Sequence, residues 1–380
     1  MTSVDEPIGR RVARWRARRR MTQQMLADRL GRSKSWVDKT ERGVRPLDRY
    51  PVIQEIARVL RVDPLVLLGE HRPPPVGASP VDGIDGIRAA LARYDEHRAT
   101  ASVAETGRHV AHAWLTYQHA HYAQVVRLLP RLLHAAQGVR AQEPGLLVQA
   151  YRITSSVLVK LGEADLGWLA ADRAVAVAGG DAALAGAAAV SVGQALRALG
   201  RDRLALVATL AAARRVAPTS EAVHGTLLIQ AALAAAGCGD AHRTEELLER
   251  AAELTARLTG DDPHRTGFGP GAVEAARVVA ALERGDAGEA VRRHEQAVRG
   301  QAWRRLPAEH RAAYLVDAAR AYLQVGDLPG AGRALVDADG VAPAEVRCRP
   351  LARTVVAEVV RAQPAPAGVA RLATLVGLIR

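Results

Sequence analysis

The chain has 380 residues, of which 49% are apolar and 3% aromatic, and its formal net charge is +12. This length allows two or three domains with sizeable cores, and the shortage of aromatic residues indicates helices packed through alanine and leucine. No stretch approaches the roughly 18 uncharged apolar residues of a membrane span, and no apolar run follows the N-terminal arginines. We therefore expect no membrane contact and a cytoplasmic location.

The positive charge is concentrated near the N-terminus. Residues 1–72 hold 17 basic and 9 acidic side chains, whereas the remainder of the chain holds 35 and 31. A basic segment joined to a nearly balanced one predicts a polyanionic partner for the basic segment. The alternative is a basic surface that only confers solubility.

The pattern at the start of the chain predicts three helices, with a tight turn between the second and the third. Apolar residues recur at helical spacing among the arginines of residues 8–20. Thr22 offers an N-cap hydroxyl for a short helix over residues 23–30. Gly31 supplies a left-handed turn, and Ser33 caps the third helix. This order is the layout of a helix-turn-helix.

Two of the three lysines in the chain lie on the third of these helices. Ser35 and Lys39 are four residues apart and share the face opposite the inward positions Val37 and Thr40, and Lys34 lies beside them at the start of the helix. Lysine can donate hydrogen bonds to guanine O6 and N7 in the major groove. The lysines are therefore candidates to read bases, the alternative being that they touch only phosphates or solvent.

A fourth and a fifth helix complete this segment. Residues 50–60 have the apolar spacing of a helix, and Asp63 with Pro64 offers the cap and first position of another. Leu65 and Leu68 would then close a five-helix core.

Two motifs in this segment are specific: the Thr-Gln-Gln-x-Leu-Ala-x-x-Leu-Gly run that starts at Thr22, and the Glu-Arg-Gly run that starts at Glu41. In these motifs residues 7–69 resemble the phage-repressor/Cro-like (XRE) family of DNA-binding domains. The resemblance implies that double-stranded DNA is the partner and that Arg16 pairs with Glu41. It places the base-reading positions on Lys34, Ser35 and Lys39.

The resemblance also implies contacts with the DNA backbone. The residues expected to make them are Gln23, Ser33, Trp36, Arg42 and Arg45. For Trp36 a second interpretation stays open, in which the indole packs on the surface of its own domain.

Residues 71–85 are expected to form a linker. Three consecutive prolines from Pro73, followed by a Gly- and Pro-containing stretch, disfavour both helix and strand. We therefore divide the chain into a helix-turn-helix domain at 1–70, this linker, and a helical domain at 86–380.

The helical domain repeats. Helix breaks recur every 38 to 46 residues, starting at Ala120, Gly162, Gly200, Gly239, Gly285 and Gly326. Small residues recur five positions after several of these breaks (Gly167, Ala205, Ala290 and Ala331) and twelve positions after (Ala174, Ala212, Ala251, Ala297 and Ala338). Small side chains at fixed positions let two helices cross closely, which predicts stacked helical hairpins.

Over about residues 105–345 these hairpins resemble tetratricopeptide repeats. The fold class expected is therefore all-α, with a five-helix helix-turn-helix domain followed by a solenoid of tetratricopeptide-like hairpins. Such hairpins form a superhelix whose concave groove usually binds peptides or partner segments. Together the two resemblances are typical of bacterial transcription regulators.

The groove has candidate ligand-binding side chains in Tyr117, Gln149, Gln194 and Gln230. The chain contains no asparagine, the amide that peptide-responsive regulators commonly use on peptide backbones, so glutamine or arginine would take that place. A peptide, a small molecule and a protein segment all stay open as partners. Tyr117 belongs to an aromatic cluster with Trp114 and Tyr122, for which a role in the core is the alternative.

No motif of a phosphate-binding loop, a zinc protease or a nucleophile elbow is present. Two histidine pairs have possible ligand spacing, His109 with His112 and His119 with His121, but no neighbouring carboxylate or thiol completes either. We therefore expect no enzyme activity, no cofactor and no metal.

The sequence thus predicts a dimeric, nucleoid-associated DNA-binding regulator that binds an inverted-repeat operator through the major groove. In it the helical domain would dimerise and sense a ligand or partner. The alternative hypothesis is a protein-interaction scaffold, partner-recruiting or antitoxin-like, with a DNA-anchoring head.

Overall fold

The computed structural model describes residues 7–18, 21–45, 47, 50–60, 67, 83–93, 102–217, 219–258, 262–361, 366 and 368–378. Within these ranges the chain forms helices and no strand, as predicted. It divides into two compact units, Met1–Gly77 and Ala78–Arg380.

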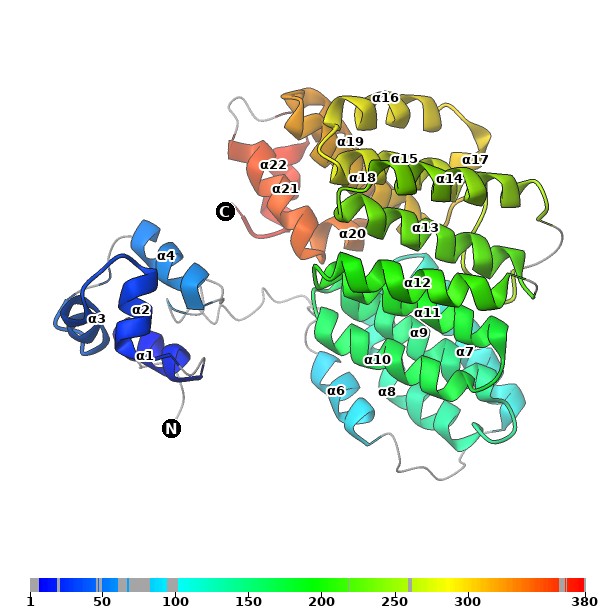
Figure 1. Ribbon diagram of the computed structural model, residues 1–380, viewed down its shortest axis with the longest axis horizontal. Coiled ribbons are helices and arrows are strands. Elements are labelled where there is room, and N and C mark those ends of the chain that lie inside the picture. Colours follow the sequence, from blue (N-terminus) through cyan, green and yellow to red (C-terminus); the bar gives the residue numbers. More distant parts are fainter. Residues whose placement is uncertain are drawn as a thin grey trace. The chain divides into compact units, whose positions relative to one another are not determined.

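The N-terminal unit contains the helices α1 (Ile8–Arg18), α2 (Gln23–Arg29), α3 (Lys34–Glu41) and α4 (Tyr50–Leu60) (Figure 1). Their inner faces form one apolar core, which includes Val12, Leu26, Ala27, Val37, Ile53, Ile56 and Leu60. The fifth helix expected around Asp63, Pro64, Leu65 and Leu68 falls outside the described residues. Leu67 is described, is fully buried and belongs to this core.

The turn between α2 and α3 forms as the sequence predicts. The Oγ1 of Thr22 accepts a hydrogen bond from the Met25 amide at 3.1 Å, and the Oγ of Ser33 accepts one from the Trp36 amide at 3.1 Å. Gly31 has φ +60°, the left-handed conformation that costs glycine least. These caps fix where α3 begins and the direction in which it leaves α2.

Gly9 lets α1 lie directly against the end of α3. A Cβ added there would lie 2.2 Å from the Thr40 carbonyl oxygen and 3.1 Å from that of Glu41. Since both neighbours are backbone atoms, they cannot move aside cheaply. The glycine therefore sets the α1–α3 distance.

The C-terminal unit is a stack of antiparallel hairpins (Figure 1). Its helices are α6 (Ile84–Ala92), α7 (Val103–Gln118), α8 (Tyr122–Gly138), α9 (Pro144–Lys160), α10 (Ala164–Ala178), α11 (Ala182–Ala198), α12 (Asp202–Val216), α13 (Glu221–Gly237), α14 (Ala241–Thr255), α15 (Pro270–Glu283), α16 (Ala287–Ala297), α17 (Gln301–Arg304), α18 (Ala308–Gln324), α19 (Leu328–Val341), α20 (Pro343–Arg347), α21 (Pro350–Arg361) and α22 (Val369–Leu375). The predicted linker ends earlier than expected, because α6 already begins at Ile84. Residues 71–82 lie outside the described ranges.

Each predicted break separates the two helices of one hairpin, which confirms the repeat. All six break residues have positive φ: Ala120, Gly162, Gly200, Gly239, Gly285 and Gly326. Most of the small residues predicted at helix crossings are buried, namely Gly167, Ala174, Ala205, Ala212, Ala251, Ala290, Ala331 and Ala338. Ala297 is half-buried. The solenoid of tetratricopeptide-like hairpins is therefore the fold of this unit.

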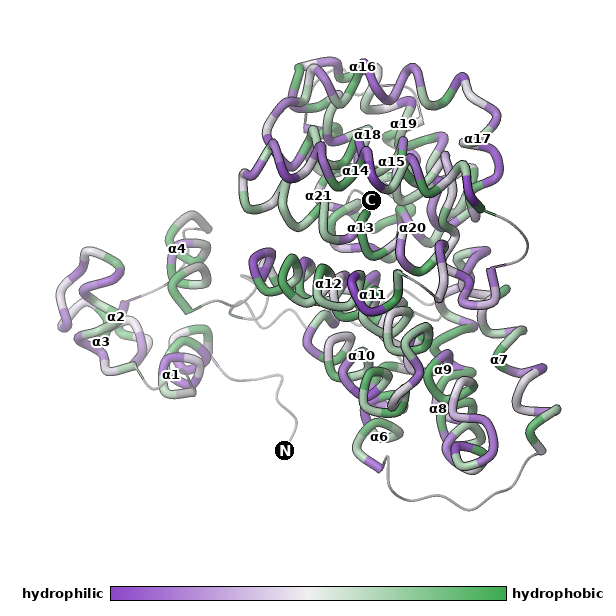
Figure 2. Tube along the Cα trace, turned by 45° about the vertical axis from the view of Figure 1, so that its right-hand side comes forward, coloured by the Kyte–Doolittle hydropathy of each residue, from purple (hydrophilic) through white to green (hydrophobic). Residues whose placement is uncertain are grey.

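The hydropathy of each helix follows from how many neighbouring helices surround it in the stack (Figure 2). Helix α13 is buried around most of its circumference and is mostly apolar, whereas α16 buries only Ala287, Ala290 and His294. A helix that is apolar on all sides is one packed on all sides. Helix α13 accordingly contacts α11, α12, α14 and α15.

The first hairpins and the C-terminal helices share one core. The apolar cluster around Tyr122 and Leu147 continues into Val346 and Val356. Lys160 lies at this junction, where its Nζ donates to Glu309 Oε2 at 2.9 Å and to Glu345 Oε1 at 2.6 Å. Glu345 is fully buried and also accepts hydrogen bonds from Arg349 and from the hydroxyl of Tyr122. The third lysine of the chain thus links α9 with α18 and α20.

Candidate nucleic-acid interface and inner-face cavities

Helix α3 presents a polar face to solvent and an apolar face to the core. Lys34, Ser35 and Lys39 are exposed, whereas Val37 and Thr40 are each 1% exposed. The structure therefore brings the three proposed base-reading side chains onto one accessible surface.

Glu41, the last residue of α3, is held from two other helices. Its carboxylate accepts hydrogen bonds from Arg16 Nε at 2.6 Å and Nη2 at 2.9 Å, and from Gln23 Nε2 at 2.9 Å. Arg16 also donates to the Met21 carbonyl at 2.8 Å. The hydrogen bond with Glu41 raises the pKa of Arg16, so the guanidinium stays charged. Gln23 thus uses one hydrogen of its side-chain amide on Glu41.

Trp36 packs on its own domain. Its indole is half-buried against the core, with the guanidinium carbons of Arg32 and Arg45 at 5.6 and 5.9 Å from the ring centroid. A cation over an aromatic face is favourable and limits where the arginine can point. Sequence reasoning missed Arg32, although its position four residues before Trp36 was a usable signal.

The other residues proposed to contact the DNA backbone already form contacts within their own domain. The guanidinium of Arg42 forms an ion pair with Asp38, and its side chain is 62% exposed. The amide of Arg45 donates to the Lys39 carbonyl at 3.0 Å, which folds the loop back on α3. Ser33 uses its Oγ as the helix cap, so its hydroxyl hydrogen is what it can offer a phosphate.

A family model described as a helix-turn-helix domain matches residues 7–68. Residues 7–68 are a helix-turn-helix domain. This domain type supports DNA binding, and the matched residues all lie within the N-terminal unit. A comparison with curated proteins gave no match.

Two kinds of solved structure are similar to the chain. Bacillus thuringiensis PlcR in complex with the peptide PapR7 and DNA is 13% identical, with a TM-score of 0.39, over 77% of this chain and 95% of that one. Tetratricopeptide-like repeats of a kinesin light chain from Podospora anserina are 21% identical, with a TM-score of 0.34, over 54% of this chain and 98% of that one.

Two of the proposed groove residues line one cavity beyond the helix-turn-helix domain. Gln194 of α11 and Gln230 of α13 lie at a cavity of about 160 Å³, together with Phe268, His310 and Tyr314. Gln230 is also within 3.4 Å of the Arg197 guanidinium. Each helix that lines this cavity is the first helix of its hairpin, and these first helices also contact one another along the stack.

A second cavity, of about 280 Å³, is lined by Gln149 and Trp114. Tyr117 lines neither of these cavities. It is 6% exposed and packs edge-on against Trp114, with its ring centroid 5.8 Å from that of Tyr122. Burial raises its pKa well above the usual value. Tyr117 is therefore a core residue, which corrects its assignment to the ligand groove.

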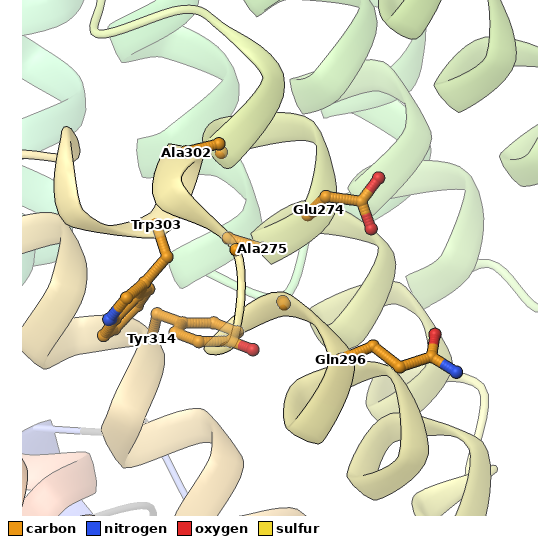
Figure 3. Close-up of a pocket in the computed structure, with 9 residues that line it drawn as sticks. Glu274, Ala275, Gln296, Ala302, Trp303 and Tyr314 are labelled. Carbon is orange, nitrogen blue, oxygen red and sulfur yellow. The ribbon is translucent and has the colours of Figure 1, made fainter.

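A third cavity, of about 200 Å³, lies where α15, α16, α17 and α18 meet. Figure 3 shows the rings of Trp303 and Tyr314 close together, with the Glu274 and Gln296 side chains extending away from them. The ring centroids are 5.1 Å apart, and the Tyr314 hydroxyl lies 2.9 Å from His294 Nδ1. These aromatic side chains pack on each other and form part of the cavity wall.

Among the residues that the structure places, no group of three or more His, Cys, Asp or Glu side chains could hold a metal ion. The rings of His119 and His121 stack on each other at 6.2 Å. Searched over the same residues, no helix has the length and apolarity needed to cross a membrane.

Proposed function

We propose that the chain is a sequence-specific DNA-binding transcription regulator whose C-terminal unit senses a ligand. The observation that carries this proposal is the exposed face of α3, where Lys34, Ser35 and Lys39 lie beside each other on a helix capped at Ser33. In a helix-turn-helix the second helix enters the major groove with its N-terminal residues on the base edges.

Each residue has a role in this arrangement. Lys39 and Lys34 would donate to guanine, and Ser35 would bond to whichever base it meets. Arg32, Arg42 and Arg45, which surround the same helix, would neutralise phosphates. Glu41 would act indirectly, because it holds Gln23 in place for a phosphate.

We further propose that the protein works as a homodimer. Two helix-turn-helix domains related by a twofold axis would bind an inverted repeat with half-sites about one helical turn, roughly 34 Å, apart. The C-terminal unit would then provide the dimer contact and the response to a ligand, either a peptide or a small molecule.

The second candidate is a protein-interaction scaffold with a DNA-anchoring head. The exposed apolar residues of α12 favour it, since Leu204 is 58% and Val207 63% exposed. Exposed aliphatic side chains on one helix are a feature of surfaces that bind other proteins.

Selection from a random DNA library by the purified full chain, followed by sequencing, tests the main proposal. Recovery of one shared inverted repeat is the expected result. Recovery of unrelated sequences would contradict a regulator that reads bases and would favour the scaffold. The chain with Lys34→Ala and Lys39→Ala serves as the control and should lose the shared sequence.

A further inference from the structure

Arg152 is a buried arginine without a hydrogen-bonded carboxylate among the described residues. It is 3% exposed, and its Nη1 donates to the Gln149 Oε1 at 3.1 Å and to the His264 carbonyl at 2.6 Å. Within the described part of the chain its Nε has no hydrogen-bond partner, and the guanidinium lies 5.2 Å from the ring centroid of Trp114. Burial lowers its pKa to about 10, with the charge of Asp262 acting against that shift. Arg152 is therefore charged at neutral pH and only partly compensated.

Gln149 is oriented by this arginine. Its Oε1 accepts hydrogen bonds from Trp114 Nε1 at 2.8 Å and from Arg152. Because both partners are obligate donors, the amide oxygen must face them. The group that Gln149 has left to offer is its Nε2 donor, and Gln149 lines the 280 Å³ cavity.

The walls of this cavity, which we call the Gln149 cavity, combine apolar surface with a positive edge. Val110 and Trp114 of α7, Leu146 of α9 and Leu184 of α11 provide the apolar part. The cavity is close in size to the smallest common ligand pockets, about 300 Å³. An apolar group the size of one ring fits such a space.

The positive charge nearest to Gln149 is that of Arg152. Arg152 lies behind the cavity and Arg265 lines it, while Glu143 lines it and Asp262 acts on Arg152 from outside the lining. The group that can bind an anion there is the Gln149 amide, with the Arg152 guanidinium directly behind it. His264 also lines it, and burial together with the charge of Arg152 lowers the pKa of its imidazole, so it is neutral at pH 7.

We propose that the Gln149 cavity binds a carboxylate that is attached to a small apolar group. Gln149 Nε2 donates to the carboxylate, the apolar group packs on Trp114 and Leu184, and Arg152 is the positioning residue that holds Gln149 and supplies the positive field. The assignment rests on the ligand-sensing role proposed for the C-terminal unit. A free organic acid and the C-terminus of a peptide share this chemistry.

Isothermal titration of the full chain distinguishes the two sources. The probes are phenylacetate with phenylacetamide as its neutral match, and the tripeptide Gly-Gly-Phe with a free or an amidated C-terminus. At least one acid should bind about tenfold or more tightly than its amide, because a hydrogen bond to a charged acceptor is the stronger one. Binding of phenylacetate identifies a free acid, and binding of only the tripeptide acid identifies a peptide terminus.

Gln149→Glu is the decisive variant, since it keeps the shape of the side chain, replaces the donor by an acceptor and pairs Arg152 internally. It should lose binding of the acid while unfolding in a cooperative thermal transition no lower than that of the unaltered chain. Gln149→Met, which removes the donor without adding a charge, should lose it as well. Gln324→Glu, at an exposed position at the end of α18, is the matched control and should bind as the unaltered chain does.

Equal binding of acid and amide, no binding of any probe, or unaltered binding by Gln149→Glu would overturn the assignment. None of these titrations contains DNA. A failed DNA selection would therefore contradict the proposed regulator and leave the cavity result standing, and the reverse also holds.

Discussion

Two buried charges, Glu41 in the N-terminal unit and Arg152 in the C-terminal unit, are paired to different degrees. In the N-terminal unit the Glu41 carboxylate is 6% exposed and receives three hydrogen bonds, two of them from one guanidinium. In the C-terminal unit Arg152 is 3% exposed, and among the described residues its guanidinium donates to an amide oxygen and a backbone carbonyl. A fully paired charge fixes the position of helices, whereas a partly paired one keeps electrostatic attraction available for a ligand.

The largest effect is expected from removing the paired charge. Glu41→Ala leaves Arg16 and Gln23 without their acceptor and should destabilise the N-terminal unit by about 3 kcal/mol. Thermal unfolding of the full chain should show an early transition for this unit and an unchanged one for the C-terminal unit. A single unchanged transition would mean that Glu41 is not structural. Glu246→Ala, at an exposed acid of α14, is the control.

The next largest effect is expected at the exposed lysines of α3. Lys39→Ala should weaken binding to the selected DNA by about 2 kcal/mol and relax the preference at one base pair. Fluorescence anisotropy on selected and random duplexes measures both. Equal weakening on the two duplexes would instead make Lys39 a phosphate contact.

A smaller effect, of opposite sign, is expected in the C-terminal unit. Gln149→Glu should stabilise it by about 1 kcal/mol, because Arg152 gains an ion-pair partner at hydrogen-bond distance. Urea unfolding measures the change. A destabilised variant would show that the Arg152 charge is already compensated, and Arg152 would then not differ from Glu41.

The smallest effect is expected from Arg32, whose guanidinium lies over the Trp36 ring. Arg32→Ala removes one cation from the indole face and should weaken DNA binding by about 0.5 kcal/mol, equally on selected and random duplexes. Anisotropy at two salt concentrations tests this, since loss of a phosphate contact also lowers the salt dependence. Arg108→Ala, at a basic side chain of the C-terminal unit, should change neither.

The features that the sequence predicts well are those encoded locally. Thr22, Gly31 and Ser33 act on backbone groups within three or four residues of themselves, so their roles follow from the sequence order. The six break residues can be predicted for the same reason, since a left-handed residue ends a helix through its own backbone conformation and needs no distant partner. Ala120 ends its helix in the same left-handed conformation although it is not a glycine.

The features that the sequence does not predict depend on distant partners. Arg152 stands inside an apolar helix, which marks it as unusual, but its contact at His264 comes from a loop 112 residues away. Tyr117 and Gln149 both carry polar groups on the first helices of their hairpins, α7 and α9. Only the packing around them shows that Tyr117 lies in the core and that Gln149 lines a cavity. Gly9 has no neighbour in sequence that requires it, because its constraint comes from α3.

The junction at Lys160 has a consequence for how this repeat unit could evolve. In an open solenoid each repeat contacts only its neighbours, so repeats can be gained or lost at an end with local effects. Here Glu345 joins α8 and α9 to helices about 200 residues later, so the number of hairpins between them is fixed by closure. Duplication or deletion of one hairpin would separate Lys160 from both of its carboxylates. The unit should therefore tolerate changes in its side chains far better than changes in its length.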